Sequence, residues 1–124
     1  LSGKADYNRL ILPEKRGYIF MSAHILAQET GLDELCVMLT GELDHHASEQ
    51  LREKLDEMIS RRHYRRVVFD MGGVSFMDSS GIGILLGRYK KLSQNGCAME
   101  IKGARDGIDK IIKMAGLYQI TRKR

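Results

Sequence analysis

One stretch, residues 67–83, constrains the fold of this chain more than any other. It opens with the apolar run Val67-Val68-Phe69, which is typical of a buried strand, and Gly72-Gly73 is predicted to end that strand. Asp78-Ser79-Ser80-Gly81 has the composition of a helix start, because Asp78 can cap free backbone N–H groups and small residues suit the first turn. Two serines are therefore predicted at the positive end of a helix, a place that suits a phosphate group.

The rest of the chain repeats this alternation of strand and helix. Apolar residues on both faces of residues 34–40 imply a strand inside the sheet with cover on each side. Asp44 is a candidate N-cap for a helix whose apolar stripe ends at Ile59. The other predictions are an edge strand over 23–28, strands over 97–102 and 117–121, and a helix over 106–115. The order β-β-α-β-α-β-α-β predicts a single α/β domain, a mixed sheet with helices packed on it, because βαβ crossovers make the inner strands parallel.

Length and composition suit one soluble domain. The 124 residues are 43% hydrophobic and 29% charged, and no apolar run approaches the roughly 20 residues that cross a bilayer. Cys36 and Cys97 each lie in an apolar, strand-like segment, which favours reduced core residues of a cytoplasmic protein over a disulfide framework. Residues 1–22 carry scattered charge without a sustained period. They are predicted to be a flexible extension upstream of a domain over residues 23–124.

The net charge of +4 and the pI near 9.2 raise the question of a nucleic-acid partner. Four arginines lie between residues 61 and 66, and a basic triplet closes the chain at residues 122–124. Cations near a helix C-terminus complement its dipole, which is the favoured interpretation. A patch facing an acidic protein partner is the second interpretation. Nucleic acid is the third, because no aromatic-studded strand or recognition-helix pattern accompanies the charge.

Two segments resemble one known family. Residues 76–90, beginning Phe76-Met77-Asp78-Ser79-Ser80-Gly81, closely resemble the phosphorylation-site segment of bacterial anti-sigma factor antagonists, which belong to the STAS-domain family. Residues 39–46 are similar to that family's second strand and first helix. The two segments have the expected separation, and the likeness extends from about His24 to Ile120. The family's chains usually continue into a further C-terminal helix, whereas this sequence ends at Arg124. The sequence therefore leaves undecided which element covers the last flank of the sheet.

The resemblance implies a binding protein that is controlled by phosphorylation. The serine directly after the aspartate, Ser79, would be the phosphoacceptor. The unmodified protein would bind an anti-sigma factor that is also a serine kinase and so release a sigma factor, in sporulation control. Phosphorylation with ATP would end the interaction, and a separate serine phosphatase acting on phospho-Ser79 would restore it. ATP and Mg²⁺ would belong to the kinase, so this chain is expected to be no enzyme, with no catalytic residue, metal or cofactor of its own.

The expected contact surface for that partner surrounds Ser79. It consists of residues before the two predicted helices and in their first turns: Gly41, Glu42, Asp44, His45, His46, Met77, Asp78, Ser80, Gly81 and Gly83. A phosphate beside Asp78 would add about 1.5 to 2 negative charges to this surface.

Other interpretations of the same residues stay open. From spacing alone, most serines at such positions are simply small polar residues of a helix start. The G-x-G-x-x-G fingerprint of dinucleotide-binding proteins differs by one residue from the spacing of Gly81, Gly83 and Gly87. The favoured interpretation is that these glycines allow close packing or the approach of a partner. His45 and His46 point about 100° apart on a helix, which is poor geometry for a shared metal. A Ser–His–Asp hydrolase lacks its G-x-S-x-G turn. Two further function classes are a scaffold STAS module of a stress-signalling assembly and a basic nucleic-acid-binding protein.

Overall fold

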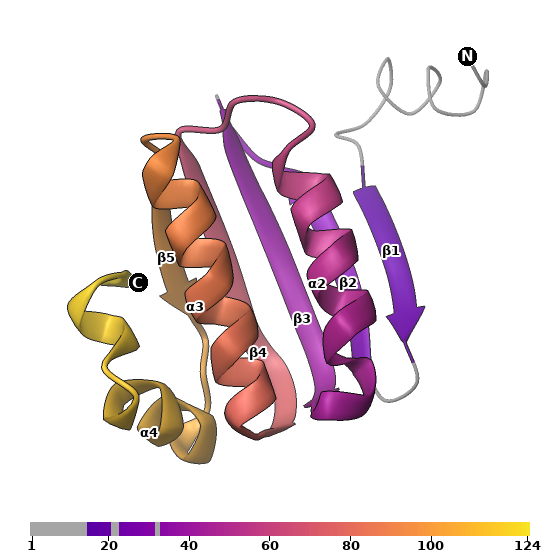
Figure 1. Ribbon diagram of the computed structural model, residues 1–124, viewed down its shortest axis with the longest axis vertical. Helices are drawn as coiled ribbons and strands as arrows, with labels where there is room; N and C mark the ends of the chain where they lie inside the picture. Colours follow the sequence, from indigo (N-terminus) through magenta and orange to yellow (C-terminus); the bar gives the residue numbers. More distant parts are fainter. Residues whose placement is uncertain (1–14, 21–22, 32) are drawn as a thin grey trace.

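The computed structural model describes residues 15–20, 23–31 and 33–124, which form one sheet with helices packed on it (Figure 1). Within these residues the strands are β1 (Lys15–Phe20), β2 (Ala23–Glu29), β3 (Glu34–Leu43), β4 (Arg66–Met77), β5 (Ala98–Lys102) and β6 (Arg122–Lys123). The helices are α2 (His45–Ile59), α3 (Ser79–Gln94) and α4 (Asp106–Met114), followed by the 3₁₀ turn η1 (Leu117–Gln119).

The sheet has the strand order β1-β2-β3-β4-β5-β6. The pairs β1–β2 and β2–β3 are antiparallel, whereas β3, β4, β5 and β6 run parallel to one another. Parallel neighbours need a crossover connection, and α2, α3 and α4 supply it. The predicted α/β class, with a mixed sheet and packed helices, is confirmed.

The core lies between the sheet and the two long helices. Figure 1 shows α2 and α3 side by side in front of the strands, both beginning at the end of the sheet where β3 and β4 end. Alternate residues of β3 face them and are fully buried: Leu35, Val37 and Leu39. The residues between them are less covered, since Cys36 is partly buried and Met38 is 40% exposed. The prediction of cover on each side of this strand is therefore wrong for Met38, because both long helices pack on the same face.

The first strands differ from the prediction. The sequence predicts a flexible extension over residues 1–22, but Lys15–Phe20 form β1 and pair with β2 in register from Lys15↔Gln28 to Phe20↔Ala23. The segment over 23–28 is consequently an interior strand and not an edge strand. Antiparallel pairing is made by backbone groups, so a strand can form without a sustained side-chain period. The rest of that prediction falls on residues 1–14 and 21–22, which lie outside the described residues.

Both central strands are longer than the sequence indicates. Residues 41–43, which follow the strand predicted over residues 34–40, complete β3. Gly72-Gly73 lies inside β4 and does not end it. The pairing of β3 with β4 shifts register twice, between Met38 and Thr40 and between Gly41 and Glu42. Glycine is required at Gly73, where an added Cβ would lie 3.0 Å from Thr40 Cβ. Irregularities of this kind bend a strand locally and change the direction in which its side chains point.

The chain end also differs from the prediction. Residues 117–121 are predicted as a strand, but they form η1 and a turn, and the strand β6 comes after them. Gly116 adopts a left-handed conformation with a φ of 80°, which turns the chain out of α4. Thr121 then donates a hydrogen bond from Oγ1 to Leu117 O at 2.7 Å and closes the turn.

A buried ion pair links the two long helices. Asp56 of α2 lies with Oδ1 2.9 Å from Nε of Arg88 and with Oδ2 3.0 Å from Nζ of Lys91, both on α3. The Arg88 side chain is only 4% exposed. Burial lowers the pKa of its guanidinium, and the charge of Asp56 opposes that shift. The cluster fixes how α2 and α3 lie against each other, and with them the two helix starts.

Candidate phosphorylation and docking site

The start of α3 is built by Asp78. Its backbone is extended, with a φ of −108°, and its Oδ1 accepts a hydrogen bond from the Ser80 N–H at 2.8 Å. Its carbonyl oxygen accepts from the N–H groups of Gly81 and Ile82 at 3.0 and 3.3 Å. Asp78 is therefore the N-cap that the sequence predicts, and Ser79 follows it as the first residue of the helix.

Ser79 is the first residue of α3 and is exposed to solvent, whereas Ser80 is half-buried. A hydroxyl at this position is open to an incoming enzyme, and it stands at the positive end of a helix of 16 residues. The structure thus meets the two geometric conditions that the sequence interpretation requires, a helix start and an accessible side chain. The assignment of Ser79 as a phosphoacceptor stays a prediction.

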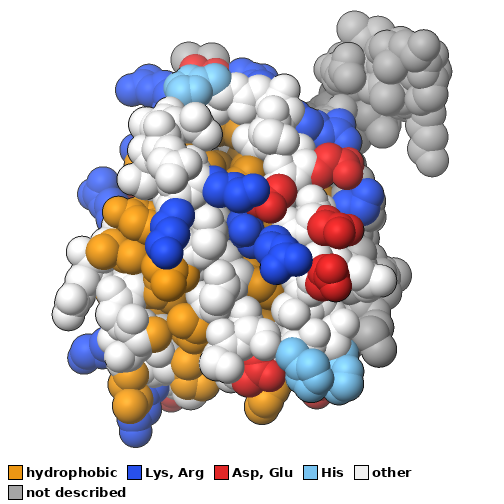
Figure 2. Space-filling view, in the orientation of Figure 1, with side chains coloured by type: hydrophobic (Ala, Val, Ile, Leu, Met, Phe, Trp, Pro, Cys, Tyr) orange, Lys and Arg blue, Asp and Glu red, His pale blue; other side chains and the backbone are white. Residues whose placement is uncertain are grey.

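The start of α2 has the same construction. Asp44 caps it, because Oδ1 accepts from the N–H groups of His46 and Ala47 at 3.1 and 3.2 Å. His45 and His46 follow in the first turn, both exposed, with ring centroids 4.1 Å apart. The predicted N-cap is confirmed. Figure 2 shows histidine and acidic side chains together at the end of the molecule where α2 and α3 begin.

The two helix starts are joined through the last residue of β3. The carbonyl oxygen of Leu43 accepts a hydrogen bond from the Asp78 N–H at 3.5 Å. The same oxygen would lie 3.0 Å from a Cβ added at Gly81, and the side chain of Met77 closes the other side of that glycine. Gly81 is therefore required by close packing. Gly83, by contrast, is exposed and has open space around it.

The structure brings the predicted contact residues together at one end of the sheet. The exposed ones are Glu42, His45, His46 and Gly83, beside Ser79. Gly41, Asp44, Asp78 and Ser80 are half-buried between them, and Met77 and Gly81 are buried beneath. Met77 and Gly81 can shape the surface but offer a partner little area. Whether the surface binds a partner stays a prediction.

Phe76 is a residue of this surface that the sequence interpretation missed. It pairs with Glu42 across the end of the sheet and is 48% exposed. It is the only aromatic residue among the large hydrophobic side chains that are exposed in the described part of the chain. The sequence shows Phe76 and Met77 as an apolar pair, but only the shifted register decides that Met77 points inward and Phe76 outward.

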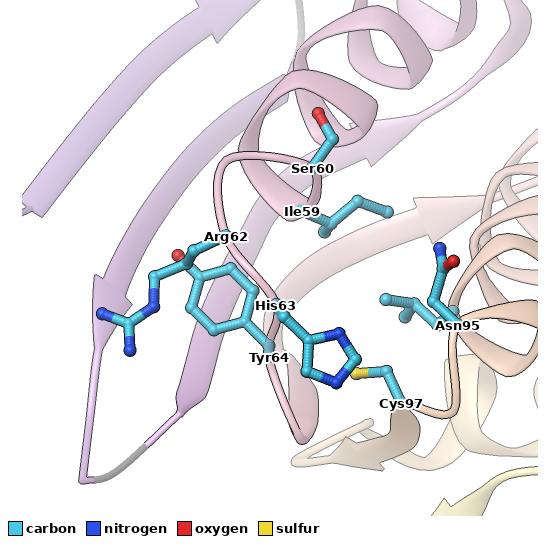
Figure 3. A pocket seen from close by; sticks show the side chains of 8 residues that line it. Ile59, Ser60, Arg62, His63, Tyr64, Asn95 and Cys97 are labelled. Atoms are coloured by element: carbon cyan, nitrogen blue, oxygen red, sulfur yellow. The ribbon is translucent and has the colours of Figure 1, made fainter.

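A different hollow lies at the opposite ends of α2 and α3. Its lining includes Ile59, His63, Leu92, Asn95 and Cys97. Figure 3 shows the labelled side chains of Ile59, His63, Asn95 and Cys97 around it. Burial raises the pKa of the Cys97 thiol, so it is protonated at neutral pH. No residue of the predicted site lines this hollow. The described part of the chain holds neither a cluster of three or more potential metal ligands nor a disulfide at Cys36 or Cys97.

Comparison with known proteins identifies the class. The family model described as "STAS domain" matches residues 24–123, so the chain belongs to the STAS-domain family. The anti-sigma F factor antagonist of Paenibacillus polymyxa is 42% identical over 86 residues, which cover 69% of this chain and 74% of the relative.

Two solved structures share both the fold and part of the sequence. The structure of the anti-sigma factor antagonist SpoIIAA in its unphosphorylated form superposes with a TM-score of 0.70 at 28% identity, covering 81% of this chain and 87% of that one. The Bacillus cell fate determinant SpoIIAA in its phosphorylated form superposes with a TM-score of 0.64, also at 28% identity, covering 81% and 90%. Among the described residues, no helix is long and apolar enough to span a membrane.

Proposed function

We propose that this protein is an anti-sigma factor antagonist whose binding is controlled by phosphorylation of Ser79. The observation that carries the proposal is the exposed Ser79 at the start of α3, directly after its capping aspartate. The relatives named as antagonists of anti-sigma F factor, and SpoIIAA solved in both phosphorylation states, support the same role. Sporulation control in the cytoplasm is the setting that these relatives favour.

In the proposed cycle the unmodified protein binds an anti-sigma factor that is also a serine kinase, and a sigma factor is released. The kinase transfers the γ-phosphoryl group of ATP to Ser79 Oγ, whose proton is lost, and ADP leaves. A serine phosphatase hydrolyses the ester and restores the binding form. This chain is then ligand and substrate, while the nucleotide and its Mg²⁺ are held by the kinase.

The geometry explains how such a modification could act without unfolding the domain. A phosphate on Ser79 brings about 1.5 to 2 negative charges to a helix N-terminus, where the dipole and free N–H groups stabilise an anion. A partner that covers this surface must instead desolvate the phosphate beside Asp78 and Glu42. A penalty of about 3 kcal/mol weakens binding more than a hundredfold.

The test is a set of serine variants incubated with the candidate kinase. Ser79→Ala should bind the kinase equally with and without ATP, and Ser79→Asp should bind weakly in both conditions. Ser80→Ala is the matched control and should still be phosphorylated, with the phosphate located by mass spectrometry. Phosphate incorporation that persists in Ser79→Ala and disappears in Ser80→Ala would contradict the assignment. A wild-type protein found only in very large particles by light scattering would favour a scaffold role.

A further inference from the structure

A second charged surface lies at the other end of the sheet from Ser79. Four side chains there form a closed ring of alternating charge. Arg66 Nη1 lies 3.3 Å from Glu34 Oε1, and Arg66 Nε lies 3.0 Å from Glu100 Oε2. Arg124 Nε lies 2.8 Å from Glu100 Oε1, and Arg124 Nη2 lies 3.6 Å from Glu34 Oε1. Each carboxylate is thus shared by two arginines, on the sheet face away from α2 and α3.

The ring holds the end of the chain on the sheet. Glu100 is 4% exposed, so its charge is buried and depends on Arg66 and Arg124 for compensation. The Arg124 N–H also donates to Ile101 O at 2.8 Å. Burial would raise the pKa of Glu34, but hydrogen bonds from Thr30 and Arg66, with further arginine charge, hold it below its ordinary value. Glu34 is therefore ionised at neutral pH. With two arginines and two glutamates, the ring has no net formal charge.

Two hollows flank Arg66 on this surface. One, of about 520 Å³, is lined by Glu34, Arg65, Arg66, Gly96 and Ala98. The other, of about 320 Å³, is lined by Arg66, Glu100, Arg122, Lys123 and Arg124. Together the lining residues include five cations and two carboxylates, a net charge of +3. Lys123 is engaged by Asp109 at 3.0 Å. Arg65 and Arg122 make no side-chain ion pair with any residue that the structure describes.

We infer that the surface formed by these two hollows binds an acidic protein segment, with one carboxylate engaging Arg65 and another engaging Arg122. The two arginines lie on either side of the ring, because Arg65 directly precedes Arg66 and Arg122 pairs with Glu100 across β5 and β6. Arginine pairs with carboxylates through strong charge-assisted hydrogen bonds. A nucleic acid fits less well. Its evenly spaced phosphates would meet Glu34 and Glu100, and neither hollow has an aromatic side chain on which a base could stack.

This binding is independent of the state of Ser79. The 12 residues of β4 separate Arg66 from the helix start, a distance of roughly 40 Å at about 3.3 Å per residue. The Debye length is about 8 Å at physiological ionic strength, so a charge on Ser79 is screened from the surface. A partner with an acidic segment could therefore stay bound through both halves of the phosphorylation cycle.

The test uses fluorescein-labelled oligoglutamate as the probe and fluorescence anisotropy as the measurement, at low and at physiological salt. The double variant Arg65→Ala/Arg122→Ala should lose about tenfold or more in affinity, since each charge-assisted hydrogen bond contributes measurably. The matched control Lys90→Ala/Lys110→Ala removes the same net charge from exposed helix positions and should change affinity about twofold or less. Ser79→Asp should leave the affinity of the probe unchanged, whether or not the kinase binds.

Three outcomes would overturn the inference. Equal losses in the arginine and lysine variants would show that only net charge matters. Absence of saturable binding by the wild-type protein at low salt would exclude the surface as a docking site. Tighter binding of an oligothymidylate with the same number of charges would assign the surface to nucleic acid. Thermal melting of each variant checks that the fold is retained. The variant Arg65→Lys/Arg122→Lys keeps both positive charges and should bind the probe more tightly than Arg65→Ala/Arg122→Ala.

Discussion

Replacing Phe76 with alanine should weaken binding to the kinase partner without disturbing the phosphorylation chemistry. Phe76 lies at the end of β4, three residues before Ser79, and 48% of its surface is exposed. A phenylalanine side chain offers roughly 200 Å² of surface, so about 100 Å² of Phe76 is available to a partner. At about 25 cal/mol per Å², its complete burial is worth about 2.5 kcal/mol. Loss of that contact corresponds to a rise in Kd of roughly 70-fold.

The assay is titration of the kinase with Phe76→Ala, followed by the initial rate of Ser79 phosphorylation over a range of protein concentrations. The KM for this protein as substrate should rise with the Kd, whereas kcat should change little, because Phe76 is not expected to contact the transferred phosphoryl group. Leu26→Ala is the matched control. Leu26 is 40% exposed on the sheet face away from the helices, so its truncation has a similar cost in folding and removes no predicted contact.

A Kd for Phe76→Ala within about threefold of the wild-type value would refute this reasoning, provided that Ser79→Asp still abolishes binding. Equal weakening by Phe76→Ala and Leu26→Ala would instead indicate a general loss of folded protein, which the melting temperatures would reveal. If the wild-type protein does not bind the kinase at all, the proposed function fails and the test says nothing about Phe76.

Three further predictions concern stability. Asp56→Ala should destabilise the fold by about 3 to 5 kcal/mol in urea denaturation, because it leaves Arg88 buried without its carboxylate, and Asp56→Leu combined with Arg88→Met should recover most of that loss. Gly81→Ala should cost about 1 to 3 kcal/mol through overpacking, whereas Gly83→Ala, with open space around it, should be neutral or stabilise α3 by up to about 1 kcal/mol. Hydrogen bonds hold the pKa of Asp109 below its ordinary value, so its contribution is present above about pH 4 and is lost as the pH falls through the lowered pKa. The melting-temperature difference between wild type and Asp109→Asn should accordingly shrink on acidification, and a constant difference would contradict this.

Local sequence patterns predicted the helices and the α/β class well, because these depend on neighbouring residues. Asp44 and Asp78 each precede a run of helix-forming residues, and both are N-caps in the structure. A cap needs only the two or three N–H groups that follow it in the chain. Burial of Leu35, Val37 and Leu39 likewise follows from their alternation in a strand.

Features that depend on two distant segments were predicted poorly. The strand β1 exists because its backbone pairs with β2, and Gly72-Gly73 stays inside β4 because β3 lies beside it with a shifted register. The outward direction of Phe76 has the same origin. Neither single-strand propensity nor hydrophobic alternation contains that register information.

The sequence by itself determined that a serine follows a capping aspartate at a helix start, because a cap is a contact between close neighbours in the chain. Only the tertiary structure decided that the start of α2 lies beside it, joined through Leu43, and that Phe76 is exposed at the same end. The same holds for the ring formed by Glu34, Arg66, Glu100 and Arg124, whose members come from four separate segments. Such neighbours meet through strand order and register, which are set by the packing of the whole sheet.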